Sequence, residues 1–400
     1  TFTGVKSMDF DEALEQGLVK WIDDSCLERY YDAVLARGVT NLSAEEIAGA
    51  PLKLVYTPLN GTGLIPVTTV LERAGITDVT VVPEQKEPNG DFPTCPYPNP
   101  EIRQAMQKGI DLCEQVHPDL LLATDPDADR VGVAVKNGDD YLLLTGNEMG
   151  VLLLDYICKT RAARGEDLTK KVAVTTIVSS AMVDALADEY GFELRRCLTG
   201  FKYIAKIIRE NEGKAKYIGG GEESFGYLAG DYVRDKDAVS ACSLAAEAAA
   251  WAMDTMGLTL YEWLQELYVK YGFYREGLVS VVRKGKEGAE LIQKMMVDFR
   301  ANPPKAILGS EVVKINDFQT LETLDVKTGA KTAIEQDRSN VLQWFTADGT
   351  AVSVRPSGTE PKIKFYFGVK APLASVADFD KTLAELDAKI EGIKKDLKLE

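Results

Sequence analysis

Short apolar strands alternate with helical stretches through much of this 400-residue chain, and the alternation starts afresh after residue 146. Such alternation is typical of a mainly parallel sheet with helices packed on both faces. We therefore expect two similar three-layer α/β domains, over 1–146 and 147–270. The predicted elements are a helix over 11–37, strands over 53–56 and 79–82, a helix over 102–116, a strand over 120–122, helices over 149–162, 181–190, 203–210 and 238–253, and strands over 171–177 and 193–196.

The pattern changes from residue 274 onward, where hairpin signals join short apolar runs. Asp348-Gly349 separates two such runs, as expected of a two-residue hairpin turn. The last helix, 379–397, repeats apolar residues three and four apart, which is also the pattern of a coiled-coil seam. Because it holds barely three heptads, we expect it to pack on a sheet instead. We predict a smaller α+β domain with a mainly antiparallel sheet over 274–400.

The charge of the chain excludes two classes of partner. It carries 46 Lys and Arg against 62 Asp and Glu, a formal net charge of -16. Such a surface repels nucleic acid and anionic lipid over most of its area, so neither is expected as a partner. An anionic small-molecule substrate would need Lys and Arg concentrated in its pocket.

Cysteine and histidine content excludes several kinds of site. The six cysteines are scattered without a CxxC pair, which is typical of reduced thiols in a cytoplasmic protein. The single histidine, His117, excludes a Ser-His-Asp triad elsewhere and argues against a His-based metal site. We find no signal peptide and no apolar run of membrane length. The chain begins Thr1-Phe2-Thr3, without an initiator Met, and we expect it to be a fragment.

The strongest chemical signal is the acidic turn DPDADR at 125–130, directly after an apolar strand. Asp125, Asp127 and Asp129 alternate, so a tight turn can direct three hard oxygens at one Mg²⁺ ion. An EF-hand is excluded because Arg130 and Lys136 stand where it needs Gly and Glu. A haloacid-dehalogenase nucleophile motif is excluded because Asp129 replaces its Thr or Val. The alternative is a solvated acidic turn, but ligands usually bind at such strand ends.

A second signal is the glycine-rich segment GGGEESFG at 219–226. Glycines let the backbone approach a ligand closely, and Glu222 and Ser224 lie on one side of an extended loop. An acceptor beside a hydroxyl suits sugar hydroxyl groups. Taken alone, the segment is equally consistent with an ordinary glycine-rich turn.

The third signal is the segment RPSGTEPK at 355–362, between two predicted strands. Arg355 offers a planar fork of donors, and Ser357, Gly358 and Thr359 add hydroxyl groups and free amides. This combination predicts a phosphate site, with a structural β-turn as the alternative.

Together the three motifs resemble the α-D-phosphohexomutase family of phosphoglucomutases and phosphomannomutases, which have four domains. The resemblance covers essentially the whole chain and matches domains two to four, with the tail of domain one before domain two. It implies a TATA-binding-protein-like C-terminal domain. It also implies magnesium ligands Asp125, Asp127 and Asp129; catalytic groups Arg130, Lys236 and Lys202; sugar contacts Glu222 and Ser224; a substrate loop with Thr199 and Gly200; and a phosphate clamp of Arg355, Ser357, Gly358 and Thr359.

By this resemblance, the parent enzyme interconverts hexose 1-phosphate and hexose 6-phosphate through a phosphoserine, Mg²⁺ and a hexose 1,6-bisphosphate. The family's first domain carries that serine in a Ser-His loop, and no Ser-His dipeptide occurs here. We therefore expect a missing N-terminal domain, an incomplete metal shell and no turnover by these residues alone. Glucose is the expected sugar. Phosphomannomutase, phosphopentomutase and a non-catalytic sugar-phosphate-binding protein are the alternatives.

Overall fold

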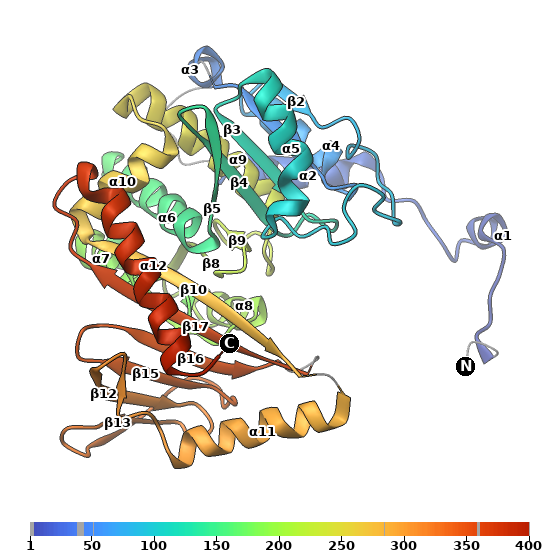
Figure 1. Cartoon of the computed structure of the whole chain (residues 1–400). Coiled ribbons are helices and arrows are strands. Elements are labelled where there is room, and N and C mark those ends of the chain that lie inside the picture. Colours follow the sequence, from blue (N-terminus) through green and yellow to red (C-terminus); the bar gives the residue numbers. More distant parts are fainter. Residues whose placement is uncertain (1–3, 38–43, 51, 284, 358–360, 400) are drawn as a thin grey trace.

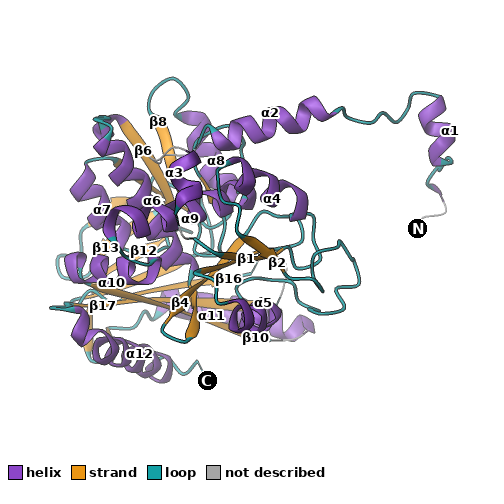
Figure 2. Cartoon of the chain, turned by 90° about the horizontal axis from the view of Figure 1, so that it is seen from above, coloured by secondary structure: helices purple, strands orange, loops and turns teal. Residues whose placement is uncertain are grey.

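The computed structural model describes residues 4–37, 44–50, 52–283, 285–357 and 361–399, and these residues form three separate sheets. Figure 1 shows the sheets in three successive parts of the molecule, with the C-terminal part at the bottom. The N-terminal arm with α1 (Phe10–Glu15) leads away from the body in both Figure 1 and Figure 2. The two α/β units and the antiparallel C-terminal unit have the predicted fold class.

The first sheet has the order β2-β1-β3-β4-β5. Its first three strands are parallel, whereas β4 and β5 form an antiparallel hairpin at one edge that the sequence analysis did not predict. The central strand β3 is buried along its whole length, and its end leads into the acidic turn. The elements of this part are α2 (Asp24–Leu35), α3 (Ala44–Gly49), β1 (Leu54–Thr57), α4 (Leu64–Arg73), β2 (Val79–Val81), α5 (Arg103–Val116), β3 (Leu120–Thr124), β4 (Val131–Asn137) and β5 (Asp140–Leu144).

The single helix predicted over 11–37 is wrong, because the structure has two helices there, α1 and α2. Gly17 adopts a left-handed φ of 70° just after α1, a conformation that ends a helix. The side chain of Asp23 then caps α2 by accepting a hydrogen bond from the Ser25 N–H. Residues 16–23 between them form neither helix nor strand, and Trp21 is 79% exposed.

The second sheet has the order β7-β6-β8-β9, with parallel β7, β6 and β8 and a short antiparallel β9. Each predicted element of this part is present within a few residues. Its elements are α6 (Gly146–Ala163), β6 (Lys171–Thr176), α7 (Met182–Tyr190), β7 (Glu193–Cys197), α8 (Phe201–Glu210), β8 (Lys216–Gly221), β9 (Tyr227–Leu228), α9 (Ala238–Trp251) and α10 (Leu260–Tyr271).

Helix α9 joins the two α/β units rather than only closing the second one. Every one of its residues is buried, because it packs on α4 of the first unit as well as on α6 and β9. Its polar Glu247 is satisfied by a 2.7 Å hydrogen bond from the Tyr156 hydroxyl. The N-terminus of α9 is therefore fixed where the first and second sheets meet.

The third sheet is antiparallel and has the order β10-β17-β16-β15-β12-β13-β14. The predicted hairpin at Asp348-Gly349 joins β15 to β16. Helix α12 packs on β17 and β10, as expected, and not as a coiled-coil seam. The elements are β10 (Phe273–Val282), α11 (Gly285–Ala301), β11 (Ala306–Ile307), β12 (Ser310–Asp317), β13 (Glu322–Asp325), β14 (Lys331–Ala333), β15 (Leu342–Thr346), β16 (Ala351–Pro356), β17 (Lys362–Ala371) and α12 (Phe379–Asp396).

The C-terminal unit is docked on the second α/β unit by specific polar contacts. Gln343 Nε2 donates to the Ile177 carbonyl at 2.8 Å, and Gln336 Nε2 donates to the Arg196 carbonyl at 3.1 Å. A small apolar cluster around Phe318 fills the space beside them. None of the described helices is both long and apolar enough to cross a bilayer.

Candidate functional site

Three carboxylates converge at the turn that follows β3. Asp125, Asp127 and Asp129 each offer an oxygen within 4.8 Å of the others. Asp125 is buried, and its Oδ1 accepts the backbone N–H groups of Asp129 and Arg130 at 3.0 and 2.9 Å. Ala128 has a left-handed φ of 55°, which tightens the turn. The alternating carboxylates are therefore held together by the backbone of their own loop.

Burial disfavours the charged form of the inner carboxyl group of this cluster, Asp125. Burial, and then the charges of Asp129 and Asp127, raise the pKa of Asp125 to about 6, although backbone hydrogen bonds oppose the shift. Carboxylate oxygens are the ligands that Mg²⁺ and Ca²⁺ prefer. The donor set therefore fits a divalent cation, which would relieve the repulsion among the three carboxylates.

Neighbouring elements fix the position of the metal loop, residues 125–130. The N–H and Oγ1 of Thr62 both donate to the Pro126 carbonyl, at 2.8 and 3.0 Å. A methyl group at Gly61 would lie 2.4 Å from the Pro126 Cα, so only glycine permits this approach. The Ala238 N–H, at the start of α9, donates to the Ala128 carbonyl at 3.1 Å. The loop is thus held from both α/β units.

Two of the predicted cations lie at the metal loop. Lys236 Nζ is 2.5 Å from Asp129 Oδ2, and its side chain is only 16% exposed. Arg130 Nε lies 3.9 Å from both Asp125 and Asp129, and its Nη1 lies 3.8 Å from Glu101. Both cations therefore lie within reach of an anion that binds beside the metal loop.

The glycine-rich loop, residues 219–226, is hydrogen bonded to the same part of the molecule. Glu222 is buried and accepts the Gly200 N–H at 2.6 Å. The Phe225 carbonyl accepts the N–H of Val131, at the start of β4, at 3.1 Å. Ser224 is half-buried two residues after Glu222. The predicted sugar contacts are therefore positioned against the metal loop.

The predicted substrate loop is only partly joined to this site. Gly200, with a φ of 119°, brings the loop to Glu222, and Thr199 precedes it. Lys202 is exposed at the start of α8, where its ammonium lies 5.0 Å from the centre of the Tyr203 ring. Among the described residues, no ion pair links Lys202 to the metal loop, unlike Lys236.

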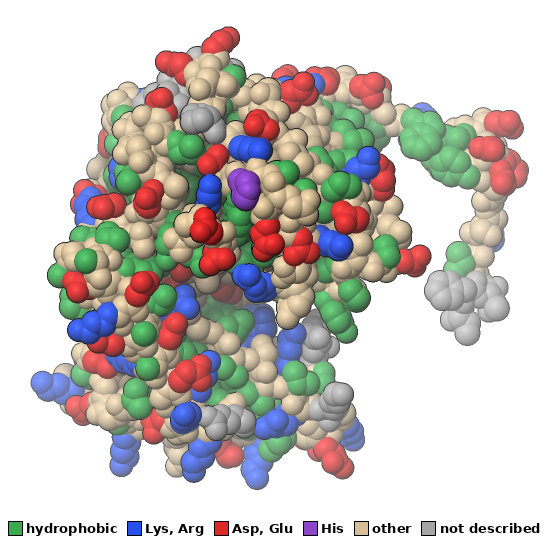
Figure 3. All heavy atoms as spheres, turned by 45° about the horizontal axis from the view of Figure 1, so that its top comes forward, with side chains coloured by type: hydrophobic (Ala, Val, Ile, Leu, Met, Phe, Trp, Pro, Cys, Tyr) green, Lys and Arg blue, Asp and Glu red, His purple; other side chains and the backbone are tan. Residues whose placement is uncertain are grey.

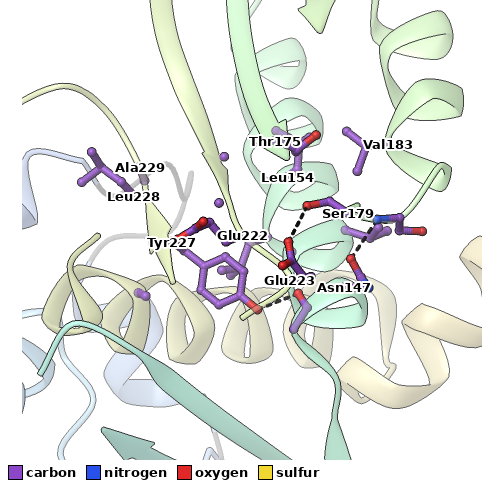
Figure 4. Close-up of a pocket in the computed structure, with 18 of the residues that line it drawn as sticks. Asn147, Leu154, Thr175, Ser179, Val183, Glu222, Glu223, Tyr227, Leu228 and Ala229 are labelled. Atoms are coloured by element: carbon purple, nitrogen blue, oxygen red, sulfur yellow. Dashed lines mark hydrogen bonds between the residues drawn. The ribbon is translucent and has the colours of Figure 1, made fainter. Parts of the chain in front are cut away.

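Figure 4 shows contacts that hold the glycine-rich loop in place. Glu223 Oε2 accepts the Thr176 hydroxyl at 2.7 Å and lies 3.5 Å from that of Ser179. The Tyr227 hydroxyl donates to the Gly146 carbonyl at 2.6 Å. A methyl group at Gly146 would lie 2.0 Å from the Glu223 carbonyl oxygen. The loop is thus locked against β6 and the start of α6.

The predicted phosphate site lies at the β16–β17 connection. Arg355 faces Lys364 across the two antiparallel strands. The Ser357 N–H donates to the Lys362 carbonyl at 2.8 Å and closes the base of the connection. Two further predicted residues lie outside the described part of the chain: Gly358 and Thr359.

The metal loop, the glycine-rich loop and the Arg355 strand approach one another. Burial raises the pKa of Glu222, and the charges of Lys236, Arg130 and Arg355 oppose that shift. One carboxyl group therefore lies within electrostatic reach of cations from all three parts. A cavity of about 590 Å³ opens on the α2 side of the metal loop, where Tyr30, Asp127 and Lys236 line it; Glu222 and Arg355 are not among its lining residues. Figure 3 shows a hollow between the upper part of the molecule and the C-terminal unit, with Lys and Arg side chains along it.

The sequence analysis missed several residues at this site. Glu101, beside Arg130, follows the proline-rich loop and carries no signal of its own. Glu223 was not distinguished from its neighbours in the glycine-rich loop. Lys364, which pairs with Arg355 across β16 and β17, was not distinguished either.

The three units together define a multidomain α/β protein with one composite polar site. Three family models match its three parts: Phosphoglucomutase/phosphomannomutase, alpha/beta/alpha domain II over residues 28–138; alpha/beta/alpha domain III over 145–271; and the C-terminal domain over 313–386. The chain belongs to the phosphoglucomutase/phosphomannomutase family.

Similar proteins carry the same family names. A phosphoglucomutase of Staphylococcus aureus is 34% identical over 345 residues, which are 86% of this chain and 60% of that protein. A phosphoglucomutase of Staphylococcus saprophyticus is 32% identical over 369 residues, 92% of this chain and 65% of that protein. The chain therefore spans less than two thirds of the length of these relatives.

Two solved structures share the fold. A putative phosphomannomutase from Thermus thermophilus matches with a TM-score of 0.60 and 20% identity, over 90% of this chain and 65% of that chain. The open form of parafusin from Paramecium matches with a TM-score of 0.59 and 15% identity, over 92% of this chain and 62% of that chain.

Proposed function

We propose that this chain supplies the metal, sugar and phosphate sites of an enzyme that interconverts hexose 1-phosphate and hexose 6-phosphate. The observation that carries the proposal is that cations and the sugar-side loop meet at the metal loop. Lys236 and Arg130 lie 2.5 and 3.9 Å from Asp129, and the glycine-rich loop that carries Glu222 accepts the Val131 N–H. A molecule that is anionic at a phosphate and rich in hydroxyl groups would satisfy all of these groups together. The phosphoglucomutase names of the relatives support glucose as the sugar.

Each side chain has a defined task in this proposal. Mg²⁺ bound by Asp125, Asp127 and Asp129 would supply positive charge next to the phosphoryl oxygens. Arg130 would donate to the reacting phosphoryl group. Lys236, within reach of both the loop and the sugar, would hold or move the hydroxyl proton. A lysine in an ion pair stays protonated until its partner is neutralised, so binding of the metal would free this group.

The remaining residues bind and orient the sugar phosphate. Glu222 and Ser224 would accept from and donate to ring hydroxyl groups. Arg355, with Ser357, Gly358 and Thr359, would hold the distal phosphate through charge-assisted hydrogen bonds. Thr199, Gly200 and Lys202 would line the sugar side. A hexose 1,6-bisphosphate would be bound by the same set, with its two phosphates at opposite ends of the site.

Calorimetric titration of the purified chain tests the proposal in two parts. Mg²⁺ is expected to bind the wild type and not Asp127→Ala, because that variant loses one of three ligands. Glucose 1,6-bisphosphate is expected to bind the wild type and to lose most of its affinity in Arg355→Ala. Equal magnesium heats for wild type and Asp127→Ala would contradict the metal site. Equal sugar-phosphate isotherms for wild type and Arg355→Ala would contradict the phosphate site.

A further inference from the structure

Gln343, on β15, joins the C-terminal sheet to the second α/β unit through a buried amide group. It is 4% exposed, and its Nε2 donates to the Ile177 carbonyl and to the Ser353 hydroxyl oxygen, both at 2.8 Å. Its Oε1 accepts the side-chain amide of Asn316 at 3.1 Å. Because both ends of the amide group are bonded, its orientation is fixed.

The turn that accepts this hydrogen bond, residues 176–180 after β6, also holds the glycine-rich loop. The Thr176 hydroxyl donates to Glu223 Oε2 at 2.7 Å. Glu223 lies between the two predicted sugar contacts, Glu222 and Ser224, on the glycine-rich loop. One short turn therefore contacts both the sugar side of the site and the C-terminal sheet.

On its other side, Gln343 is bonded to the strand that carries the predicted phosphate site. Ser353 precedes Arg355 by two residues on β16, so the two side chains leave the same face of the sheet. A chain of contacts therefore runs from the glycine-rich loop through the turn and Gln343 to the Arg355 strand.

The two units are not packed continuously beside Gln343. A cavity of about 610 Å³ lies between them there, with Ile177 and Ser353 in its lining. Close packing therefore does not fix their distance at this point, and hydrogen bonds across the boundary matter more. Gln336 makes another such bond, to the Arg196 carbonyl at 3.1 Å. Of these two bonds, only that of Gln343 ends on the turn that holds the glycine-rich loop.

We propose that Gln343 is a positioning residue, which holds the Arg355 strand and the glycine-rich loop in register so that one sugar phosphate contacts both. This inference rests on the proposed function, because that function needs the two parts to bind the same molecule. A ligand that contacts both parts binds more tightly when their separation is already fixed, since less freedom is lost on binding. A ligand that contacts only one of them gains nothing from the register.

The test compares ligands that contact one part of the site with a ligand that contacts two. Gln343→Met keeps the side-chain length, removes both donors and is expected to weaken glucose 1,6-bisphosphate binding about three- to tenfold in calorimetry, the range for a neutral hydrogen bond. Binding of Mg²⁺, measured in the same way, should be unchanged. Inorganic phosphate is too small to contact both parts, so it should raise the melting temperature of variant and wild type equally.

Gln336→Met is the matched control at the same boundary. It should bind glucose 1,6-bisphosphate within about twofold of wild type, because the contact between Gln343 and the turn remains. Thermal unfolding shows whether each variant is folded. Gln343→Asn, whose amide is set back by one methylene, replaces Gln343→Met if the latter is unfolded.

A double-mutant cycle tests whether the effect passes through the turn. Thr176→Val removes the hydroxyl that holds Glu223, leaves the C-terminal sheet unchanged and should weaken glucose 1,6-bisphosphate binding by a similar factor. If both substitutions break one chain of contacts, the double variant should bind within about threefold of either single variant. Additive losses would mean that the two residues act independently.

The outcomes separate this inference from the proposed function. Weaker glucose 1,6-bisphosphate binding in Gln343→Met, with Mg²⁺ and phosphate binding unchanged and Gln336→Met like wild type, supports both. Unchanged binding in a folded Gln343 variant, while Arg355→Ala loses affinity, overturns only the inference. Equal weakening of all three ligands, equal weakening by Gln336→Met, or additive losses in the cycle also overturn only the inference. A folded wild type that does not bind glucose 1,6-bisphosphate overturns both.

Discussion

Replacing Lys236 by Met is expected to tighten magnesium binding, although it removes a residue of the site. Lys236 Nζ lies 2.5 Å from Asp129 Oδ2. A magnesium ion bound to that oxygen would lie about 2.1 Å from it, so the ion and the ammonium would be at most about 4.6 Å apart. Two unit charges at 4 Å interact by about 1 kcal/mol in bulk water, so a divalent ion beside the ammonium costs about 2 kcal/mol. Removing that repulsion should raise the affinity roughly ten- to thirtyfold.

Titration calorimetry of Mg²⁺ near neutral pH measures the change directly. Lys236→Arg keeps the charge and should bind within about threefold of wild type. Lys214→Met removes an exposed lysine elsewhere in the second unit and should leave the affinity unchanged. The reasoning fails if folded Lys236→Met binds Mg²⁺ no more tightly than wild type, because Asp129 would then not be the oxygen that ion and lysine share. The same variant should bind glucose 1,6-bisphosphate more weakly, since its lysine also serves the sugar side.

Three further predictions concern stability and turnover. Burial raises the pKa of Glu276 to about 7. The free energy of unfolding should therefore fall as pH rises from about 4.5 to 7, because the folded state binds the proton more tightly than the unfolded state. Chemical denaturation of Glu276→Gln should show a flatter pH dependence. Gly146→Ala would place a methyl group 2.0 Å from the Glu223 carbonyl oxygen and should destabilise the fold by about 1–3 kcal/mol, whereas Gly150→Ala, with its nearest atom at 3.4 Å, should be tolerated in thermal melts. The purified chain should not convert glucose 1-phosphate in a coupled assay with glucose 1,6-bisphosphate present, because no Ser-His dipeptide occurs in its sequence; turnover free of contaminating mutase would contradict this.

The local elements of the fold were largely predictable because their determinants are local. The all-apolar run Leu120–Leu122 predicts a buried strand, and the structure extends it as β3 to Thr124. The Asp348-Gly349 signal predicts a hairpin for the same reason, since the turn chemistry lies in adjacent residues. The prediction of one helix over 11–37 was wrong because Gly17 ends one helix and Asp23 caps the next. The prediction used only the apolar periodicity and gave no weight to these two residues.

The edge hairpin of the first sheet was missed because its strands resemble their surroundings. β4 begins directly after the acidic turn, and the sequence analysis assigned no structure to 131–144. Those residues alternate less clearly than a half-buried strand should, since the first five of β4 are all buried. Burial on both faces removes the two-residue period that identifies a strand from its sequence.

Which residues meet at the site depends on contacts between the units, and no short motif encodes those contacts. The motifs around Asp125, Glu222 and Arg355 can be recognised in the sequence. Whether these three residues lie near one another depends on how the units dock. α9 fixes the metal loop through the Ala238 N–H, and the C-terminal sheet is fixed by the contact between Gln343 and Ile177. Each contact joins residues that are distant in sequence, so neither period nor spacing reveals it.

The unpaired charge of Lys364 illustrates what such docking creates. In the sequence it is one lysine of a Lys-Ile-Lys-Phe strand pattern, which is typical of a solvated strand face. In the structure its surroundings desolvate the ammonium, and no acid among the described residues is close enough to form an ion pair with it. Charges left unpaired in this way are unfavourable in the free protein and become favourable when an anion binds.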